Sequence, residues 1–178
     1  MKTLNVEMIV TPKTPKQIRK GVKLLLSALK ITDAKPVYLS FTHRSDTYLN
    51  SFCFKNCEDE KKKTGCEIIY GWSLWEDKKL GFYEAEFHSV IKDNGDLIDI
   101  TPRRKNEDSI LFVSDMSKTS GRKSVNSWHS WSNCKIVNGH VAEVSVELEI
   151  VQADGELSEF RTAHAIAGKK LIVKSSER

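Results

Sequence analysis

The chain has 178 residues, of which 39% are hydrophobic and 29% charged, with a net charge of +4. This length fits one compact domain and is too short for two of ordinary size. The composition excludes a disordered chain, and no apolar run approaches the roughly 20 residues that a transmembrane helix needs. The positive charge is small and spread along the chain, so it does not favour a nucleic-acid partner.

The compartment is expected to be the cytoplasm. The N-terminal segment has no continuous apolar stretch and no small-residue cleavage site, so it does not resemble a secretory signal, and no membrane association is expected. In the cytoplasm the cysteines would be reduced. There are four of them: Cys53, Cys57, Cys66 and Cys134.

The first part of the chain is expected to supply the helices. Residues 6–10 favour a short strand. Residues 15–30 then carry aliphatic side chains at helical spacing, which predicts an amphipathic helix starting at Pro15. A strand is expected at 36–42, followed by a second helix over about 52–63 that Gly65 ends.

From residue 67 onward the pattern is typical of strands. Asn94-Gly95 predicts a two-residue hairpin turn, because both residues tolerate positive φ. The polar segment 114–134 shows no clear period and is expected to be a surface loop. Strands are expected at 68–76, 82–92, 97–101, 110–113 and 141–151. The resulting fold class is α+β, one domain over residues 1–178 with N-terminal helices packed on an antiparallel sheet.

Cys53 is the favoured nucleophile, because it falls in the first turn of the second expected helix. The free N–H groups and the dipole of a helix N-terminus lower the pKa of a thiol, and the thiolate is the reactive form. The same N–H groups are suited to bind a developing oxyanion. Cys57 lies one turn deeper.

The predicted hairpin brings a histidine and an aspartate together. If Asn94 and Gly95 form the turn, Asp99 lies opposite Val90, and His88 shares the face of Val90. His88 and Asp99 are then diagonal neighbours, within roughly 7–8 Å between Cβ atoms. A one-residue bulge would move one of them to the other face.

These residues together predict a Cys-His-Asp triad within residues 45–115. Cys53 would be the nucleophile, His88 the general base and Asp99 the residue that orients the imidazole. Three further side chains are expected to line the site. Asn56 lies on the helix of Cys53, Trp72 would wall the cleft, and Glu86 shares the face of His88.

The order Cys53, His88 and Asp99-Ile100-Thr101-Pro102 resembles the papain-like superfamily in its compact transglutaminase-like form. Gly71-Trp72 followed by Glu84-Ala85-Glu86-Phe87-His88 also resembles a set of small uncharacterised bacterial proteins. The resemblance implies a papain-like core and thiol chemistry on an amide or thioester, as in a cysteine hydrolase or acyltransferase acting on a peptide-like or acyl substrate without a cofactor. Ser89-Val90 depart from the residues that often follow the superfamily's histidine.

Two other classes stay open. The first is a non-catalytic binding or accessory module on the same fold, which a buried, inert Cys53 would favour. The second is a small zinc-binding protein using Cys53, Cys57, Cys66 and His88, although their C-x3-C-x8-C spacing differs from the usual C-x2-C pairs. Glu84 and Glu86 beside His88 offer a further metal alternative. The sequence leaves the oligomeric state and the substrate open.

Overall fold

The computed structural model describes residues 3–103, 107–152 and 169–176 of the chain. Within these residues twelve strands dominate, and only two α-helices of nine and twelve residues accompany them. The expected α+β fold, with N-terminal helices packed on a sheet as a papain-like core, is therefore wrong. The fold is β-rich and mainly antiparallel, because segments without a clear sequence period also form strands.

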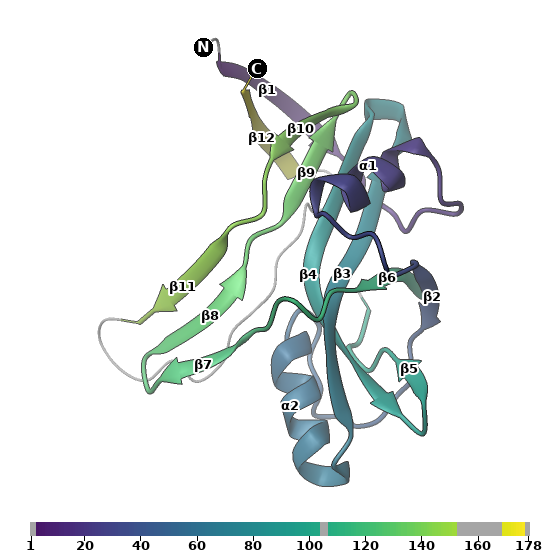
Figure 1. Ribbon diagram of the computed structural model, residues 1–178, viewed down its shortest axis with the longest axis vertical. Coiled ribbons are helices and arrows are strands. Elements are labelled where there is room, and N and C mark those ends of the chain that lie inside the picture. Colours follow the sequence, from purple (N-terminus) through teal and green to yellow (C-terminus); the bar gives the residue numbers. More distant parts are fainter. Residues whose placement is uncertain (1–2, 104–106, 153–168, 177–178) are drawn as a thin grey trace.

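The longest strands are β3 and β4, which lie at the centre of the molecule (Figure 1). The helices are α1 (Lys20–Ala28) and α2 (Cys53–Thr64), with a 3-10 turn at Lys78–Leu80. The strands are β1 (Thr3–Val10), β2 (Val37–Ser40), β3 (Glu67–Asp77), β4 (Phe82–Asp93), β5 (Asp96–Ile98), β6 (Ser109–Ser114), β7 (Gly121–Ser124), β8 (Ser127–Trp131), β9 (Cys134–Val137), β10 (His140–Glu143), β11 (Glu147–Val151) and β12 (Lys169–Ser176).

The strands form three sheets. The largest has the order β10-β9-β4-β3-β6-β2, with β5 also paired to β4. A three-stranded sheet, β11-β8-β7, projects from it and is called the arm below; it forms the lower left of Figure 1. A two-stranded ribbon of β1 and β12 joins the two ends of the chain at the top.

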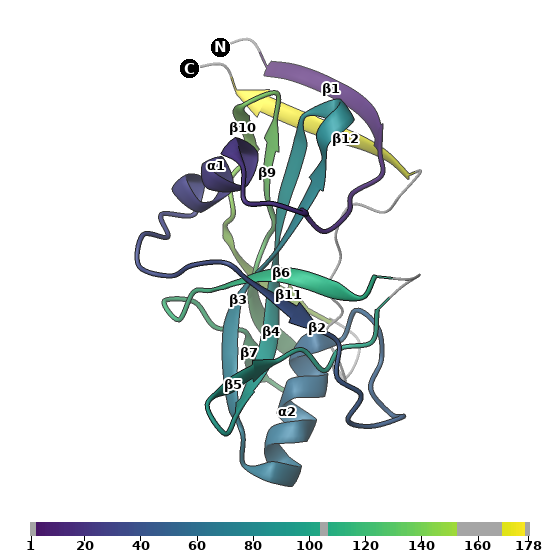
Figure 2. The same cartoon turned by 90° about the vertical axis from the view of Figure 1, so that its right-hand side faces the viewer.

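The sheet formed by strands β2 to β6 curves, so that the residues following β2 lie beside the residues following β5. Phe41 forms a parallel bridge with Asp99, and the amide of Thr42 donates to the carbonyl of Asp99 at 2.8 Å. Figure 1 shows β2 and β5 to the right of the long β3–β4 pair, on the side that faces the viewer in Figure 2. These five strands are called the ring below. Its closure joins strands from the two ends of the sheet order.

The ring has two faces with separate apolar clusters. The inner face carries Ile69, Val90, Ile110 and Phe112, with Leu39 and Leu97 packed against them. The outer face carries Trp72, Leu74, Ala85 and Phe87, which pack with side chains from both helices. Alternation along the strands produces this division, so neighbouring residues of β4 belong to different clusters.

The helices differ in detail from the expected ones. α1 begins at Lys20, after a start that the sequence placed at Pro15, and buries Val22 and Leu25. α2 begins at Cys53 without a side-chain cap and ends where Gly65 adopts a φ of +73°. Glycine adopts this left-handed conformation without steric strain, which explains the end of the helix. No helix in the described part of the chain is long and apolar enough to span a bilayer.

Residues 114–134 are not simply a loop. They contain β7 and β8, and Trp128 on β8 is buried in the outer-face cluster. The strand expected at 141–151 is interrupted at residues 144–146, so that β10 pairs with β9 and β11 pairs with β8. Residues 153–168 lie outside the described residues.

Candidate functional site

The predicted hairpin register is confirmed for the pairs that form, which end at Ile91 and Ile98, whereas Asp99 bridges Phe41 instead of pairing with Val90. Ile91 lies opposite Ile98 and Lys92 opposite Leu97, and both Asn94 and Gly95 have positive φ. His88 and Asp99 consequently face the inside of the ring together. The Nε2 atom of His88 lies 3.3 Å from the Oδ1 atom of Asp99. His88 is 2% exposed and Asp99 is fully buried, so the pair is shielded from water.

Arg103 completes this buried pair, and the sequence reasoning missed it. Its guanidinium forms an ion pair with the second carboxylate oxygen of Asp99. Burial lowers the pKa of Arg103, and the charge of Glu86 nearby opposes that effect. The signal available in the sequence is only a basic residue four positions after Asp99, and many arginines would satisfy that description.

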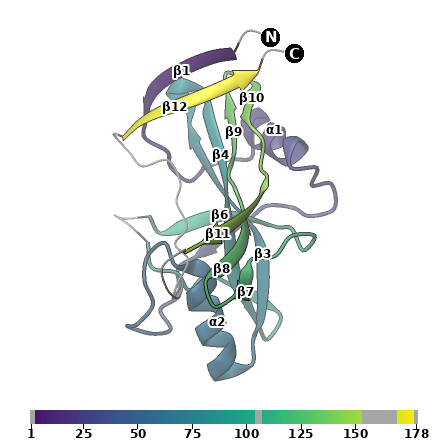
Figure 3. The ribbon, with the colours of Figure 1, turned by 90° about the vertical axis from the view of Figure 1, so that its left-hand side faces the viewer.

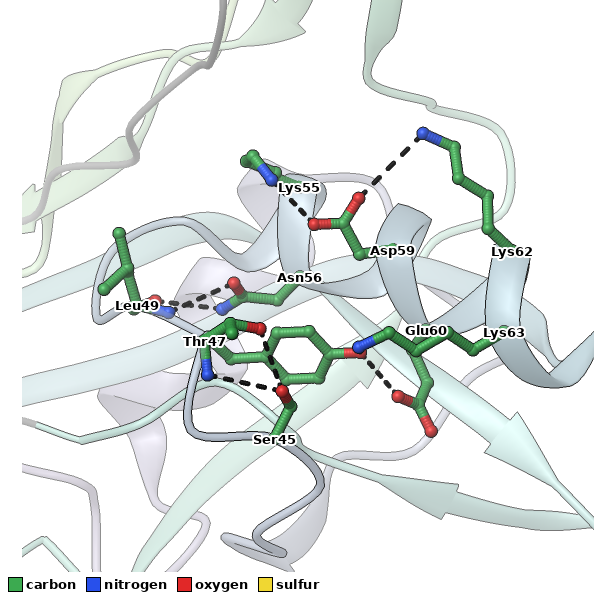
Figure 4. Close-up of polar contacts among 10 residues, drawn as sticks. Ser45, Thr47, Leu49, Lys55, Asn56, Asp59, Glu60, Lys62 and Lys63 are labelled. Carbon is green, nitrogen blue, oxygen red and sulfur yellow. Dashed lines mark hydrogen bonds and ion pairs between the residues drawn. The ribbon is translucent and has the colours of Figure 1, made fainter.

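The segment from Asp99 to Arg103 is held by the chain that leads into α2. Asn56 donates from its side-chain amide to the carbonyl of Leu49 at 2.9 Å and to the hydroxyl of Thr101 at 3.3 Å. Figure 4 shows the Asn56 amide turned toward Leu49 in the preceding loop. Asn50 donates to the carbonyl of Pro102 at 2.7 Å. Asn56 therefore acts as a clamp between helix, loop and ring.

His88 uses only one of its two ring nitrogens. Asp99 engages Nε2, whereas Nδ1 has no hydrogen-bond partner among the described residues. A neutral imidazole facing an ionised Asp99 would carry its proton on Nε2 and present a lone pair at Nδ1. The ring of Phe112 lies edge-on to the imidazole, with 6.3 Å between centroids.

Cys53 lies on the other side of the strand. It is fully buried in the outer-face cluster with Phe54, Trp72 and Phe87. Phe87 and His88 are adjacent in β4 and point to opposite faces, so Cys53 packs outside the ring and His88 points inside it. The predicted triad is therefore only partly assembled: the structure joins His88 to Asp99 and does not join Cys53 to His88.

The other thiols are also buried. Burial raises the pKa of Cys57 well above its usual range, although the hydroxyl of Ser89 beside it lowers the pKa to a lesser extent. Burial likewise raises the pKa of Cys134 to about 11. These thiols are held in the neutral form, which is the poor nucleophile and the poor metal ligand.

The four residues of the zinc alternative do not come together. Cys57 and Cys66 share an outer-face cluster with Ile91, whereas His88 points to the inner face. Across the described ranges, no group of three or more histidine, cysteine or acidic side chains is arranged to hold a metal ion.

The expected lining residues separate in the same way. Trp72 belongs to the outer-face cluster, where its ring lies 5.0 Å from that of Phe87 and its Nε1 donates to Asp115 at 3.0 Å. Glu86 lies two residues before His88 in β4, so its side chain points to the same inner face. Trp72 and Glu86 thus cannot line one cleft.

Comparison with protein-family models, with curated proteins and with solved structures finds no match to this chain. The fold and the site define a β-rich domain with a closed ring, a buried His-Asp-Arg network and a projecting arm.

Proposed function

We propose that the protein is a non-catalytic binding module. The observation that carries this proposal is the position of Cys53 and His88 on opposite faces of β4. A thiol and its general base must lie within hydrogen-bond reach of one another to act together. The complete burial of Cys53 supports the same conclusion, because an acyl substrate has to contact the sulfur.

In this proposal the network of His88, Asp99 and Arg103 stabilises the ring. Asp99 carries the bridge to Phe41 through its backbone and the ion pair to Arg103 through its side chain. Buried charges that are paired and hydrogen-bonded hold one arrangement of the chain, because breaking the pair is strongly unfavourable. The ring would then be the rigid scaffold from which the arm projects.

Alkylation with iodoacetamide at a series of pH values, resolved for each cysteine by mass spectrometry, tests the proposal. In the native protein we expect Cys53 to react no faster than Cys134, and we expect both to react rapidly only after unfolding. Replacing His88 by Ala should not slow the alkylation of Cys53, and neither should the control His129→Ala on β8. Circular dichroism shows whether each variant remains folded.

A second candidate is a cysteine hydrolase or acyltransferase acting on an amide or thioester. The Nδ1 atom of His88, which has no partner among the described residues, favours this candidate. A histidine base that Asp99 orients through Nε2 presents Nδ1 for proton transfer. A thiolate at Cys53 would also interact electrostatically with the guanidinium of Arg103. Fast alkylation of Cys53 below the ordinary thiol pKa of about 8.5, slowed by His88→Ala but not by His129→Ala, would favour this candidate over the binding module.

We also propose a cytoplasmic location. All four cysteines are free and buried. Free thiols fit a reducing compartment, where disulfide formation is not favoured. Quantifying reduced and oxidised thiols in protein trapped directly from cells tests this, and stable disulfides would contradict it.

A further inference from the structure

Among the described residues, β11 pairs only with β8, which leaves the backbone groups along its outer edge without a partner strand there. In the arm, Ser132 donates its amide to the carbonyl of Val146, and Gln152 donates to Asn126, both at 2.9 Å. In an antiparallel pair, every second residue of a strand directs its N–H and C=O groups toward the partner strand. Because Val146 and Gln152 bond to the chain of β8, the even-numbered residues of β11 between them also direct these groups toward β8. Glu147, Glu149 and Val151 therefore direct theirs away from it. Figure 3 looks at the side of the molecule on which β11 lies.

The side chains along this edge are apolar on one face and acidic on the other. Val144, Val146 and Leu148 are 60%, 54% and 36% exposed. Leu148 lies opposite Ser130 and shares a face with the buried Trp128, so the apolar row continues the core outward. Within residues 141–151 the charged side chains are all glutamates, at positions 143, 147 and 149.

The glutamates oppose pairing of β11 with a second copy of itself. An antiparallel pair centred on Glu147 or on Glu149 places that residue opposite its own copy, and a pair centred on Leu148 places Glu147 opposite Glu149. Like charges directly opposite one another destabilise a sheet. Lys123 and Lys135 offset part of the charge on Glu149 and Glu143, but Glu147 has no ion-pair partner within the described ranges.

We propose that the edge of β11 binds an extended segment of a partner protein in which basic and aliphatic residues alternate. The partner strand would add to the arm through the free backbone groups of Glu147, Glu149 and Val151, as in recognition by strand addition. Its lysine or arginine side chains would face Glu147 and Glu149, and its aliphatic side chains would extend the row of Val146 and Leu148. This inference rests on the proposed binding function and names its partner.

Fluorescence anisotropy with a labelled peptide of alternating lysine and valine tests the edge in the full chain. A peptide of alternating glutamate and valine is the control. We expect the lysine peptide to bind saturably and the glutamate peptide not to bind. The net charge of the protein is +4, so its overall field repels this peptide and binding must come from a local surface. No saturable binding, or equal binding of both peptides, would overturn the proposal.

Two substitutions separate backbone pairing from charge. Glu149→Pro removes an outward N–H, which an edge strand tolerates, and should weaken binding about tenfold or more. Glu149→Gln keeps the N–H and should weaken binding only a few-fold. The double variant Glu147→Lys/Glu149→Lys should lose the lysine peptide and bind the glutamate peptide. Unchanged preference in this charge-reversed variant would overturn the proposal, even if Glu149→Pro fails to fold.

The two proposals fail in different experiments. Absence of peptide binding together with an inert Cys53 would remove the partner and leave the binding module in place. Fast, His88-dependent labelling of Cys53 would remove the non-catalytic function. In that case the anisotropy result alone decides whether the edge of β11 binds a strand.

Discussion

The ring and the arm are both built from antiparallel strands, but they treat their edges differently. In the ring, the chain after β2 meets the chain after β5, and buried charges lie at the junction. In the arm, β8 pairs with one side of β11, no described strand pairs with the other side, and Val146, Glu149 and Val151 are exposed. A closed sheet has no unpaired strand edge, whereas an open sheet exposes the backbone N–H and C=O groups of its edge strands. The residues that close the ring and the edge proposed for partner binding therefore lie in different regions.

The largest expected effect is in the ring. Asp99→Ala leaves the buried guanidinium of Arg103 and the imidazole of His88 without their carboxylate, and should lower the free energy of unfolding by about 3–5 kcal/mol. Urea denaturation measures this. The control Asp46→Ala removes an exposed carboxylate and should change the stability by less than about 0.5 kcal/mol.

A double variant sharpens this result. In Asp99→Ala/Arg103→Met the unpaired buried charge is absent, so the protein should be more stable than Asp99→Ala alone. Equal stability of the two variants would show that the loss comes from something other than an uncompensated guanidinium. The ring would then owe its closure to the backbone bridge at Phe41.

An intermediate effect is expected where the ring meets the arm. Asp115 accepts a hydrogen bond from Trp72 of the ring, and it pairs with Lys118, whose ammonium lies 5.0 Å from the centre of the Trp131 ring in the arm. Burial acts to raise the pKa of Asp115, but the hydrogen bonds from Ser117, Trp72 and Lys118 outweigh it and hold the pKa below 3.8. The carboxylate form is therefore the stabilising one.

The sign of the pH dependence follows from this lowered pKa. The stability that Asp115 contributes is complete above its ordinary pKa of 3.8 and is lost as the pH falls through the lower folded value. Asp115→Asn should lower the free energy of unfolding by about 1–2 kcal/mol at pH 7, and the difference from wild type should shrink below pH 3.8. A constant difference from pH 7 to pH 2, measured by urea denaturation, would contradict the assignment.

The sequence predicts the local geometry of the hairpin better than it predicts the closure of the ring. Positive φ at Asn94 and Gly95 determines the hairpin, and strand alternation then places His88 and Asp99 on one face. The face on which Cys53 packs cannot be derived in this way, because it depends on how α2 lies against the sheet. Closure at Phe41 and pairing of β8 with β11 join distant segments, and no local pattern encodes such contacts.

The smallest expected effect is at the edge of the arm, and a matched substitution in the ring makes it informative. Val113→Thr places a hydroxyl in the buried outer-face cluster and should lower the free energy of unfolding by about 1–3 kcal/mol. Val146→Thr makes the same change at an exposed position, where the hydroxyl stays hydrated, and should lower it by less than about 0.5 kcal/mol. Urea denaturation measures both. If Val146→Thr were as destabilising as Val113→Thr, the Val146 side chain would be covered in solution, and the arm would present no free edge to a partner strand.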